Sequence, residues 1–188
     1  MKQKNGIVTA AKQLASSHWD NRPDNTDISL LVIHNISLPA GDFSGHNVED
    51  FFTGQLNYKT HPSFLELENL RVSSHLYIRR NGSCIQFVNF EKRAWHAGVS
   101  NFQGRENCND FSIGIELEGT DDCDFTNEQY HQLADVSRQI LKAYPKIRPE
   151  NICGHSDIAP SRKTDPGPHF DWGRYLNSLD FGDRQNDI

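Results

Sequence analysis

The sequence predicts an α/β (α+β) fold, in which helices flank a central mixed β-sheet within a single domain spanning residues 1–188. Three observations support this class: two strand patterns at residues 28–34 and 111–119, an Asn-Gly pair between two further strand patterns, and a helix-capping sequence at 126–129. The 188 residues suffice for one domain with a sizeable core but not for two comfortable ones, and we find no repeat or linker.

The first strand pattern ends on a histidine. Residues 1–27 form an N-terminal arm of mixed composition, in which a short helix is possible around residues 10–16. Residues 28–34 are apolar on both faces, which is typical of a central strand in an α/β sheet. His34 therefore stands at the carboxyl end of a buried strand, where such folds usually place ligands. A hydrogen-bonded core histidine is an equally good interpretation of this pattern.

A long connection and a hairpin follow. Residues 36–70 hold little regular structure apart from an amphipathic piece at 48–52, and a connection of this length is usually functional. This connection could form one wall of a groove or cover it. Asn81-Gly82 separates strand patterns at 72–78 and 84–88, which predicts a β-hairpin. His75 lies mid-strand, so we favour a structural role for it over a ligand role.

The second central strand carries a candidate acid. Residues 111–119 alternate apolar and polar side chains, which places Glu116 beside Gly114 on the polar face. The glycine clears space around the carboxylate. Alternatively, the strand simply exposes its polar face to water.

The C-terminal part supplies two helices and a rigid loop. The capping box at 126–129 begins an amphipathic helix that Pro145 ends, residues 152–154 form a short strand, and residues 172–179 form a last amphipathic helix. Residues 181–188 are expected to be a frayed tail. Three prolines and two glycines argue against any helix in residues 154–168, and a rigid loop of this kind suits His155, Lys163 and Asp165 as fixed polar groups.

Bulk composition excludes several classes of function. A net charge of -6 argues against a nucleic-acid partner, and no apolar run is long enough to cross a bilayer. The residues after Lys2 and Lys4 are too polar for a secretion signal, so we expect a cytoplasmic protein. The four cysteines form no C-x-x-C pair, and we expect free thiols that are mostly packed inside.

Three residues could hold a catalytic zinc ion. His34, His155 and Asp165 would supply the three protein ligands that such a site needs, leaving one position for water. Glu116 is the candidate general base, and Lys163 is the candidate cation for the tetrahedral oxyanion. From spacing alone the assignment is weak, because His61, His75 or His96 could compete and no short zinc motif is present. A serine or cysteine triad is not excluded by composition, although no G-x-S-x-G elbow is present.

Four stretches together resemble the zinc-dependent N-acetylmuramoyl-L-alanine amidases: residues 31–39, 93–99, 109–121 and 154–168. The resemblance implies a zinc groove at one edge of a mixed sheet, with one Zn²⁺ per chain on His34, His155 and Asp165. It places the catalytic glutamate on Glu116 and the transition-state lysine on Lys163. Many relatives outside the cytosolic branch use cysteine as the third ligand. With Asp165 at that position, this chain resembles the cytosolic branch.

The resemblance also implies a substrate. Members of the cytosolic branch cut the amide between the lactyl group of 1,6-anhydro-N-acetylmuramic acid and L-alanine of the stem peptide, in peptidoglycan recycling. We therefore expect a soluble anhydro-muropeptide as substrate, no nucleic-acid or membrane partner, and a monomer. Some members of the wider family carry a catalytic tyrosine after the first strand, whereas this chain has His46 and no tyrosine before Tyr58.

The substrate suggests further binding residues. Its stem peptide carries carboxylates, for which Arg71 and Arg105 are candidate partners, although both could simply face solvent. We expect the remaining contacts, to peptide backbone or sugar, from Asn35, Trp95, His96, Ala97 and Gly98. The small residues at 97 and 98 would permit close backbone approach, whereas Trp95 could instead fill the edge of the core.

Two other functions fit the same fold. One is a peptidoglycan-binding module that has lost catalysis, which the retention of all three ligands, Glu116 and Lys163 disfavours. The other is an amidase that acts on intact murein, either a secreted autolysin or a phage endolysin.

Asp157 lies in the same loop as His155 and Asp165, and we expect it to have a structural role and not to be a metal ligand.

Overall fold

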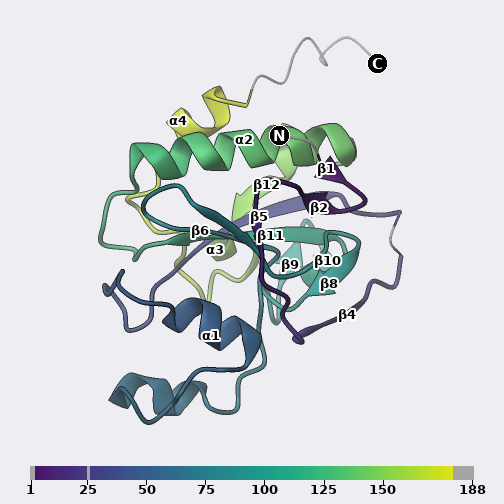
Figure 1. The fold of residues 1–188 in the computed structure, drawn as a ribbon. Coiled ribbons are helices and arrows are strands. Elements are labelled where there is room, and N and C mark those ends of the chain that lie inside the picture. The colour runs from purple at the N-terminus through teal and green to yellow at the C-terminus, as the bar shows by residue number, and fades with distance from the viewer. Residues whose placement is uncertain (1–2, 25, 180–188) are drawn as a thin grey trace, which may run out of the picture.

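A six-stranded mixed sheet forms the centre of the computed structural model, which describes residues 3–24 and 26–179 (Figure 1). β6 and β7 are antiparallel, and every other neighbouring pair in the sheet is parallel. The predicted fold class is confirmed. In spatial order the strands are β12 (Ile152–Gly154), β5 (Leu30–Ile36), β11 (Ser112–Glu118), β6 (Leu76–Ile78), β7 (Cys84–Gln86) and β3 (Lys12–Gln13).

Shorter elements surround this sheet. Three two-stranded antiparallel pairs are β1 (Gln3–Lys4) with β2 (Ile7–Val8), β4 (Trp19–Asn21) with β8 (Lys92–Ala94), and β9 (Asn101–Phe102) with β10 (Arg105–Glu106). The α-helices are α1 (Asn47–Thr53), α2 (Asn127–Ala143), α3 (His155–Ile158) and α4 (Trp172–Asn177). The 3-10 helices are η1 (Pro62–Leu67), η2 (Cys108–Asp110) and η3 (Pro149–Asn151). Within the described ranges, no helix is long and apolar enough to span a membrane.

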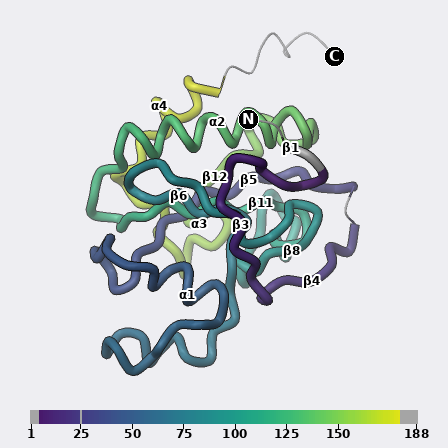
Figure 2. The backbone as a smooth tube through the Cα atoms, in the orientation of Figure 1, coloured from purple at the N-terminus to yellow at the C-terminus, as the bar shows by residue number. Residues whose placement is uncertain are grey.

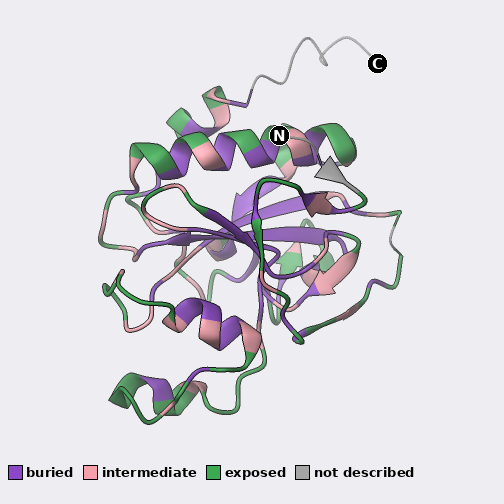
Figure 3. Cartoon of the chain, viewed as in Figure 1, coloured by how far each residue is buried: buried purple, intermediate pink, exposed green. Residues whose placement is uncertain are grey.

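The long helix α2 covers one face of the sheet. Thr126 caps it through the reciprocal contacts with Gln129 that its sequence predicts. The side of α2 that faces the sheet is buried and the outer side is exposed (Figure 3). α4 packs on α2, where the Ser137 and Tyr175 hydroxyls lie 2.7 Å apart. The main core cluster joins α2 to the odd-numbered positions of the two central strands, Leu31, Ile33, Ile113, Ile115 and Leu117.

The opposite face of the sheet carries two separate apolar clusters. One gathers around α1 and Tyr77, and the other gathers around Leu30 and Val32 of β5. Because side chains alternate along a strand, His34 of β5 and Glu116 of β11 also point to this face. Polar side chains of the two longest strands thus share one face, away from α2.

The N-terminal arm is held by a buried arginine. Arg22 is 7% exposed and donates hydrogen bonds to four backbone carbonyls, at 2.7 to 3.1 Å, those of Phe90, Asn109, Asp110 and Ser112. Burial lowers the pKa of Arg22 to about 10, which leaves the guanidinium charged at neutral pH. Figure 2 shows the arm running past β3 to β4, which pairs with β8.

Replacing Arg22 with methionine is expected to lower the free energy of unfolding by about 3 kcal/mol. Hydrogen bonds from charged donors contribute about 1.5–3 kcal/mol each, and the variant leaves buried carbonyls without partners. Urea unfolding followed by circular dichroism measures the change. Arg148 is exposed, so Arg148→Met is the control and should change stability by less than about 0.5 kcal/mol. A loss at Arg22 no larger than in the control would contradict the anchoring role.

Most element predictions are confirmed, and two are wrong. The hairpin, the two central strands, the short strand, the long helix and the last helix all form, while the tail at 181–188 lies outside the described residues. The possible helix at 10–16 is instead an edge strand, because Leu14 and Ser16 donate backbone hydrogen bonds to β7 and the residue after it. The loop at 154–168 contains the helical turn α3. All four thiols are free, and Cys84, Cys108 and Cys153 are buried.

Candidate active site

Three side chains from two neighbouring strands and one loop converge at a single point. His34 is near the carboxyl end of β5, His155 directly follows the adjacent strand β12, and Asp165 lies ten residues further along. The Nδ1 atoms of His34 and His155 are 3.0 Å apart. Asp165 Oδ2 lies 3.0 Å from His34 Nδ1 and 3.1 Å from His155 Nδ1. Both imidazoles are buried and the carboxylate is half-buried.

The loop after β12 folds back on itself so that residues 155 and 165 meet. Asp157 Oδ2 accepts a 2.7 Å hydrogen bond from the Gly154 amide, which caps the single turn α3. The Ser156 amide donates to the Asp165 carbonyl at 2.9 Å and closes the loop. A Cβ on Gly154 would lie only 2.7 Å from Pro166 Cδ, so the glycine permits this close approach. Asp157 thus has the structural role that we expected.

Each imidazole is also held at its other nitrogen. His155 Nε2 lies 3.1 Å from the Ala97 carbonyl, so in the neutral ring Nε2 carries the proton and Nδ1 presents a lone pair. His34 Nε2 lies 2.9 Å from His96 Nδ1. Burial lowers the pKa of His34 to about 4, against the opposing effect of Asp165, so this ring is neutral at neutral pH. Burial by itself raises the pKa of Asp165, but the hydrogen bonds with His155 and His34 outweigh it and hold the pKa below its usual range.

The donor set fits a zinc ion. Lone-pair atoms of two imidazoles and a carboxylate face one another 3.0 to 3.1 Å apart, and a shared cation removes their mutual repulsion. These separations are close to the roughly 3.3 Å between two tetrahedral ligands that each lie about 2.0–2.1 Å from zinc. Neutral imidazole and ionised carboxylate are also the protonation states that metal binding requires.

Glu116 is a buried acid on the same face of the sheet as His34. Its residue is 8% exposed, and among the described residues its Oε2 atom has no hydrogen-bond partner. Burial raises its pKa well above the ordinary glutamate value, the charge of Asp165 adds to this, and Lys163 opposes it. A carboxylate with a raised pKa is suited to accept a proton near neutral pH. Lys163 is half-buried, and its charge acts on both His34 and Glu116.

A groove of about 460 Å³ opens beside Asp165 and Lys163. Asn35 forms part of its wall and donates hydrogen bonds to Asp121 Oδ1 at 2.7 Å and to the Pro166 carbonyl at 3.0 Å. The structure thus brings Asn35, Lys163 and Asp165 to one surface depression. Its full lining is Asn35, Ile36, Ser37, Ala40, Gly119, Thr120, Asp121, Asp122, Arg162, Lys163, Thr164 and Asp165.

The predicted substrate loop at 95–98 lies behind the candidate metal ligands His34 and His155. The His96 imidazole is 9% exposed and contacts His34 at one nitrogen and Ser112 Oγ at the other, at 3.0 Å. This placement suits His96 to contact His34, a candidate metal ligand, and not to contact substrate. Trp95 is half-buried and stacks on His18 with ring centroids 6.3 Å apart, Ala97 is buried, and Gly98 is exposed.

The two arginines proposed for the stem-peptide carboxylates do not line the groove. The Arg71 side chain is exposed and donates to the carbonyls of Glu68 and Leu70, both at 3.0 Å. Arg105 pairs with Asp27 at 2.7 Å and lies 3.7 Å from the Phe111 ring centroid. Phe111 precedes β11, so Arg105 sits at the amino end of that strand, whereas Glu116 lies near its carboxyl end. Substrate binding by these arginines stays a prediction that the groove does not favour.

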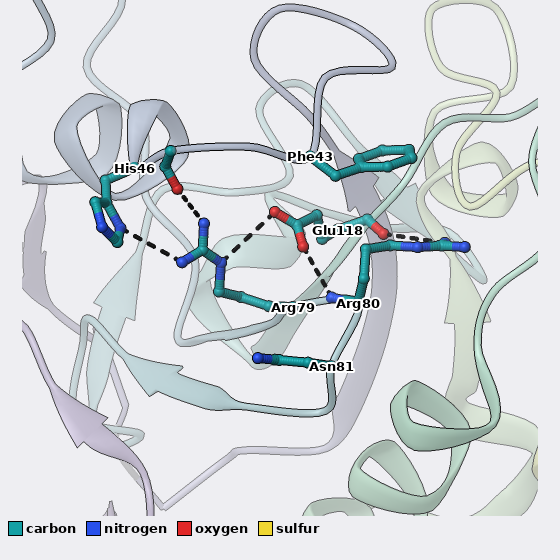
Figure 4. Close-up of a pocket in the computed structure, with 7 residues that line it drawn as sticks. Phe43, His46, Arg79, Arg80, Asn81 and Glu118 are labelled. Atoms are coloured by element: carbon teal, nitrogen blue, oxygen red, sulfur yellow. Dashed lines mark hydrogen bonds and ion pairs between the residues drawn. The ribbon is translucent and has the colours of Figure 1, made fainter.

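A second pocket of about 370 Å³ is lined by Phe43, Gly45, His46, Arg79, Arg80, Asn81 and Glu118 (Figure 4). Its charged groups satisfy one another: Arg79 donates to the Gly45 carbonyl and lies 3.6 Å from Glu118, and Glu118 accepts the Arg80 amide at 2.8 Å. Arg80 also lies 5.0 Å from the Phe43 ring centroid. We interpret this network as one that holds residues 43–45 near the carboxyl end of β11.

Sequence reasoning missed Arg162 and Ser112 beside the site and assigned Gly114 a different role. Arg162 donates to the carbonyls of Ala97 and Val99 at 2.7 and 2.9 Å. Ser112 contacts His96, and a Cβ on Gly114 would lie 2.5 Å from the His96 ring. The glycine therefore clears space for His96, whereas the sequence pattern assigned that space to Glu116. A glycine within the strand pattern was the available signal, because it marks a close approach.

Comparisons with known proteins identify relatives over nearly the whole chain. The N-acetylmuramoyl-L-alanine amidase family model matches residues 24–168. The 1,6-anhydro-N-acetylmuramyl-L-alanine amidase AmpD of Haemophilus influenzae is 57% identical over 174 residues, covering 93% of this chain and 95% of the relative. The crystal structure of an Se-Met AmpD derivative superimposes with a TM-score of 0.93 at 52% identity, covering 95% of this chain and 99% of that one.

A more distant structure contains a bound substrate. The N-acetylmuramyl-L-alanine amidase AmiD from E. coli, in complex with anhydro-N-acetylmuramic acid-L-Ala-D-gamma-Glu-L-Lys, is 30% identical with a TM-score of 0.59. The match covers 94% of this chain and 65% of that one. The family model covers residues 24–168, and the two AmpD matches each cover more than nine-tenths of the chain. This chain therefore belongs to the N-acetylmuramoyl-L-alanine amidase family.

Proposed function

We propose that this protein is a zinc-dependent amidase that hydrolyses the bond between the lactyl group of 1,6-anhydro-N-acetylmuramic acid and L-alanine of the stem peptide. One observation carries the proposal: His34, His155 and Asp165 present three lone-pair atoms to one point, on the face of the sheet that also carries Glu116, whose Oε2 atom has no hydrogen-bond partner among the described residues. One Zn²⁺ per chain, a cytoplasmic location and a monomeric state complete the proposal.

The residues divide the chemistry between them. Zinc, when bound, activates water and polarises the amide carbonyl. Glu116 takes the proton from the attacking water, because its raised pKa lets it accept a proton and then return it to the leaving nitrogen. The Lys163 ammonium stabilises the negative charge that develops on the carbonyl oxygen. His34, His155 and Asp165 stay in place throughout, held by the folded loop and the two buried strands.

The named relatives support the substrate class. AmpD of Haemophilus influenzae carries the 1,6-anhydro-muramyl specificity in its name, and the AmiD structure contains an anhydro-muramyl tripeptide. The walls of the groove beside Asp165 offer polar groups that a peptide could contact, such as Asp121, Thr120 and Asn35. A soluble anhydro-muropeptide is therefore the proposed substrate, and intact murein is the alternative.

A paired assay tests the proposal. Purified protein of measured zinc content is incubated separately with soluble anhydro-muramyl tripeptide and with purified sacculi, and products are identified by mass spectrometry. We expect one zinc per chain and release of a tripeptide with a free L-alanine amino group, with strong preference for the soluble substrate. Glu116→Ala protein serves as the blank.

Three outcomes would overturn parts of this proposal. Preference for sacculi would replace the recycling substrate with intact murein. Binding of muropeptide without any cleavage by zinc-loaded protein would favour a non-catalytic recognition module. Full activity after complete removal of zinc by a chelator would refute the metal-dependent mechanism.

A further inference from the structure

One short loop contacts both histidine ligands from behind. Residues 95–98 follow β8 and pass under the metal site, where His96 approaches His34 and the Ala97 carbonyl approaches His155. The two contacts involve the nitrogens that face away from Asp165. The same loop was expected, from sequence, to bind sugar or peptide.

The contact with His34 depends on a relay of neutral groups. His34 Nε2, His96 Nδ1, His96 Nε2 and Ser112 Oγ form a chain with steps of 2.9 and 3.0 Å. A neutral His34 that presents its Nδ1 lone pair to a cation must carry its proton on Nε2 and donate it to His96. His96 then carries its own proton on Nε2 and donates to Ser112. The hydroxyl of Ser112 can rotate, so its oxygen can accept this hydrogen bond from His96 Nε2.

The position of His96 is fixed by the strand beneath it. Gly114 leaves the space that the imidazole occupies, since any Cβ there would lie 2.5 Å from the ring. The rings of His34 and His96 meet edge to face with centroids 5.0 Å apart, which aligns the nitrogen of one with the nitrogen of the other. The packing therefore leaves His96 little freedom to turn away from His34.

The contact with His155 has only one possible direction. The Ala97 carbonyl can only accept, so His155 Nε2 donates to it and Nδ1 keeps the lone pair. Arg162 donates to this same carbonyl at 2.7 Å and to the Val99 carbonyl at 2.9 Å, which holds the loop against α3. Gly98 has φ +59°, and a Cβ there would lie 3.1 Å from Arg162 Nη2. The glycine therefore allows Arg162 to lie close to the loop.

We propose that residues 95–98 form a positioning element for the metal, in which His96 and the Ala97 carbonyl select the Nδ1-presenting tautomers of His34 and His155. The inference rests on the proposed zinc site. In this proposal, His96 positions the metal ligand His34 and does not bind substrate. Groups that support ligands in this way typically change metal affinity by about 10–100-fold when removed.

Zinc titration of four proteins tests this role. Zn²⁺ dissociation constants, measured by competition with a chromophoric chelator, are compared for wild type, His96→Leu, His96→Asn and His75→Leu. The His96→Leu variant should bind zinc about 10–100-fold more weakly. The His96→Asn variant should recover most of this loss, because an asparagine oxygen can accept the His34 proton near the position of Nδ1.

His75→Leu is the matched control. His75 is fully buried with its ring centroid 5.7 Å from that of His96, but it accepts from the Gly114 amide at 3.0 Å and not from a ligand. Its loss should lower the melting temperature of the metal-free protein and leave the zinc affinity of the folded protein unchanged. If His96→Leu does not fold, Arg162→Met on the exposed side of the loop provides the second variant, and it should also weaken zinc binding.

A spectroscopic measurement separates positioning from general destabilisation. Nitrogen-15 NMR of zinc-loaded wild type should show His34 and His155 protonated at Nε2. Wild-type zinc affinity in His96→Leu, or equal losses in His96→Leu, His96→Asn and His75→Leu, would overturn the inference while leaving the proposed function intact. A wild-type protein that binds no zinc would overturn the proposed function itself, and the inference with it.

Discussion

Replacing Asp165 with alanine is expected to abolish zinc binding and amidase activity together. The variant removes one of three converging ligand atoms and the negative charge that favours a dication between two buried imidazoles. The loss of zinc affinity should exceed the roughly 10–100-fold that is typical for a residue that only supports a ligand. Metal analysis after dialysis, together with turnover of anhydro-muramyl tripeptide, measures both quantities.

Asp157→Asn is the matched control in the same loop. Its amide oxygen can still accept the hydrogen bond from the Gly154 backbone, so α3 and the ligand positions should be preserved. This control should therefore keep its zinc and most of its activity. An Asp165→Ala protein that retained stoichiometric zinc and turnover would remove Asp165 from the proposed ligand set.

Replacing Glu116 with glutamine is expected to leave zinc content unchanged and to reduce kcat by about 10²–10⁴-fold, the usual contribution of a general acid–base group. We expect this side chain to act in the reaction and not to stabilise the fold, since its Oε2 atom has no hydrogen-bond partner among the described residues. Its raised pKa means that the folded metal-free protein disfavours the ionised carboxyl, so the neutral amide should be at least as stable at neutral pH. Steady-state kinetics with matched zinc content separates kcat from KM.

Glu118→Gln supplies the comparison for this second variant. Glu118 lies two residues further along β11 on the same face, is also buried, and is bound by Tyr77 and the Arg80 amide. Its replacement should lower stability, because it disturbs a satisfied network, but should keep zinc and leave kcat far closer to wild type. Near-normal kcat in Glu116→Gln would return that residue to a structural role.

The local sequence was sufficient for the regular elements. The apolar run at 28–34 becomes β5 because both faces of that strand are covered, and the capping box at 126–129 begins α2 where its side chains can satisfy free backbone amides. The hairpin forms at Asn81-Gly82, with Gly82 at φ +78°. For the start of α2 and for the hairpin, the deciding interactions lie within a few residues.

Local patterns were wrong at two places and left a third open. Residues 10–16 look helical in isolation, but the open edge of β7 offers them backbone hydrogen bonds. The prolines of the loop at 154–168 argue against a helix, yet the single turn α3 precedes them and is capped by Asp157. The alternating strand at 111–119 could have faced water, whereas all seven residues of β11 are buried in the middle of the sheet.

The sequence by itself determined the fold class, the strand that ends near His34 and the identity of the candidate ligands, because periodicity, capping and the resemblance to a family are local or cumulative properties of the chain. Tertiary structure alone decided that His34, His155 and Asp165 face one another, that His96 lies behind His34, and that Arg105 is remote from Glu116. These relations depend on strand order and register, which bring His34 into contact with residues 62 to 131 positions away through a sheet that no short pattern specifies.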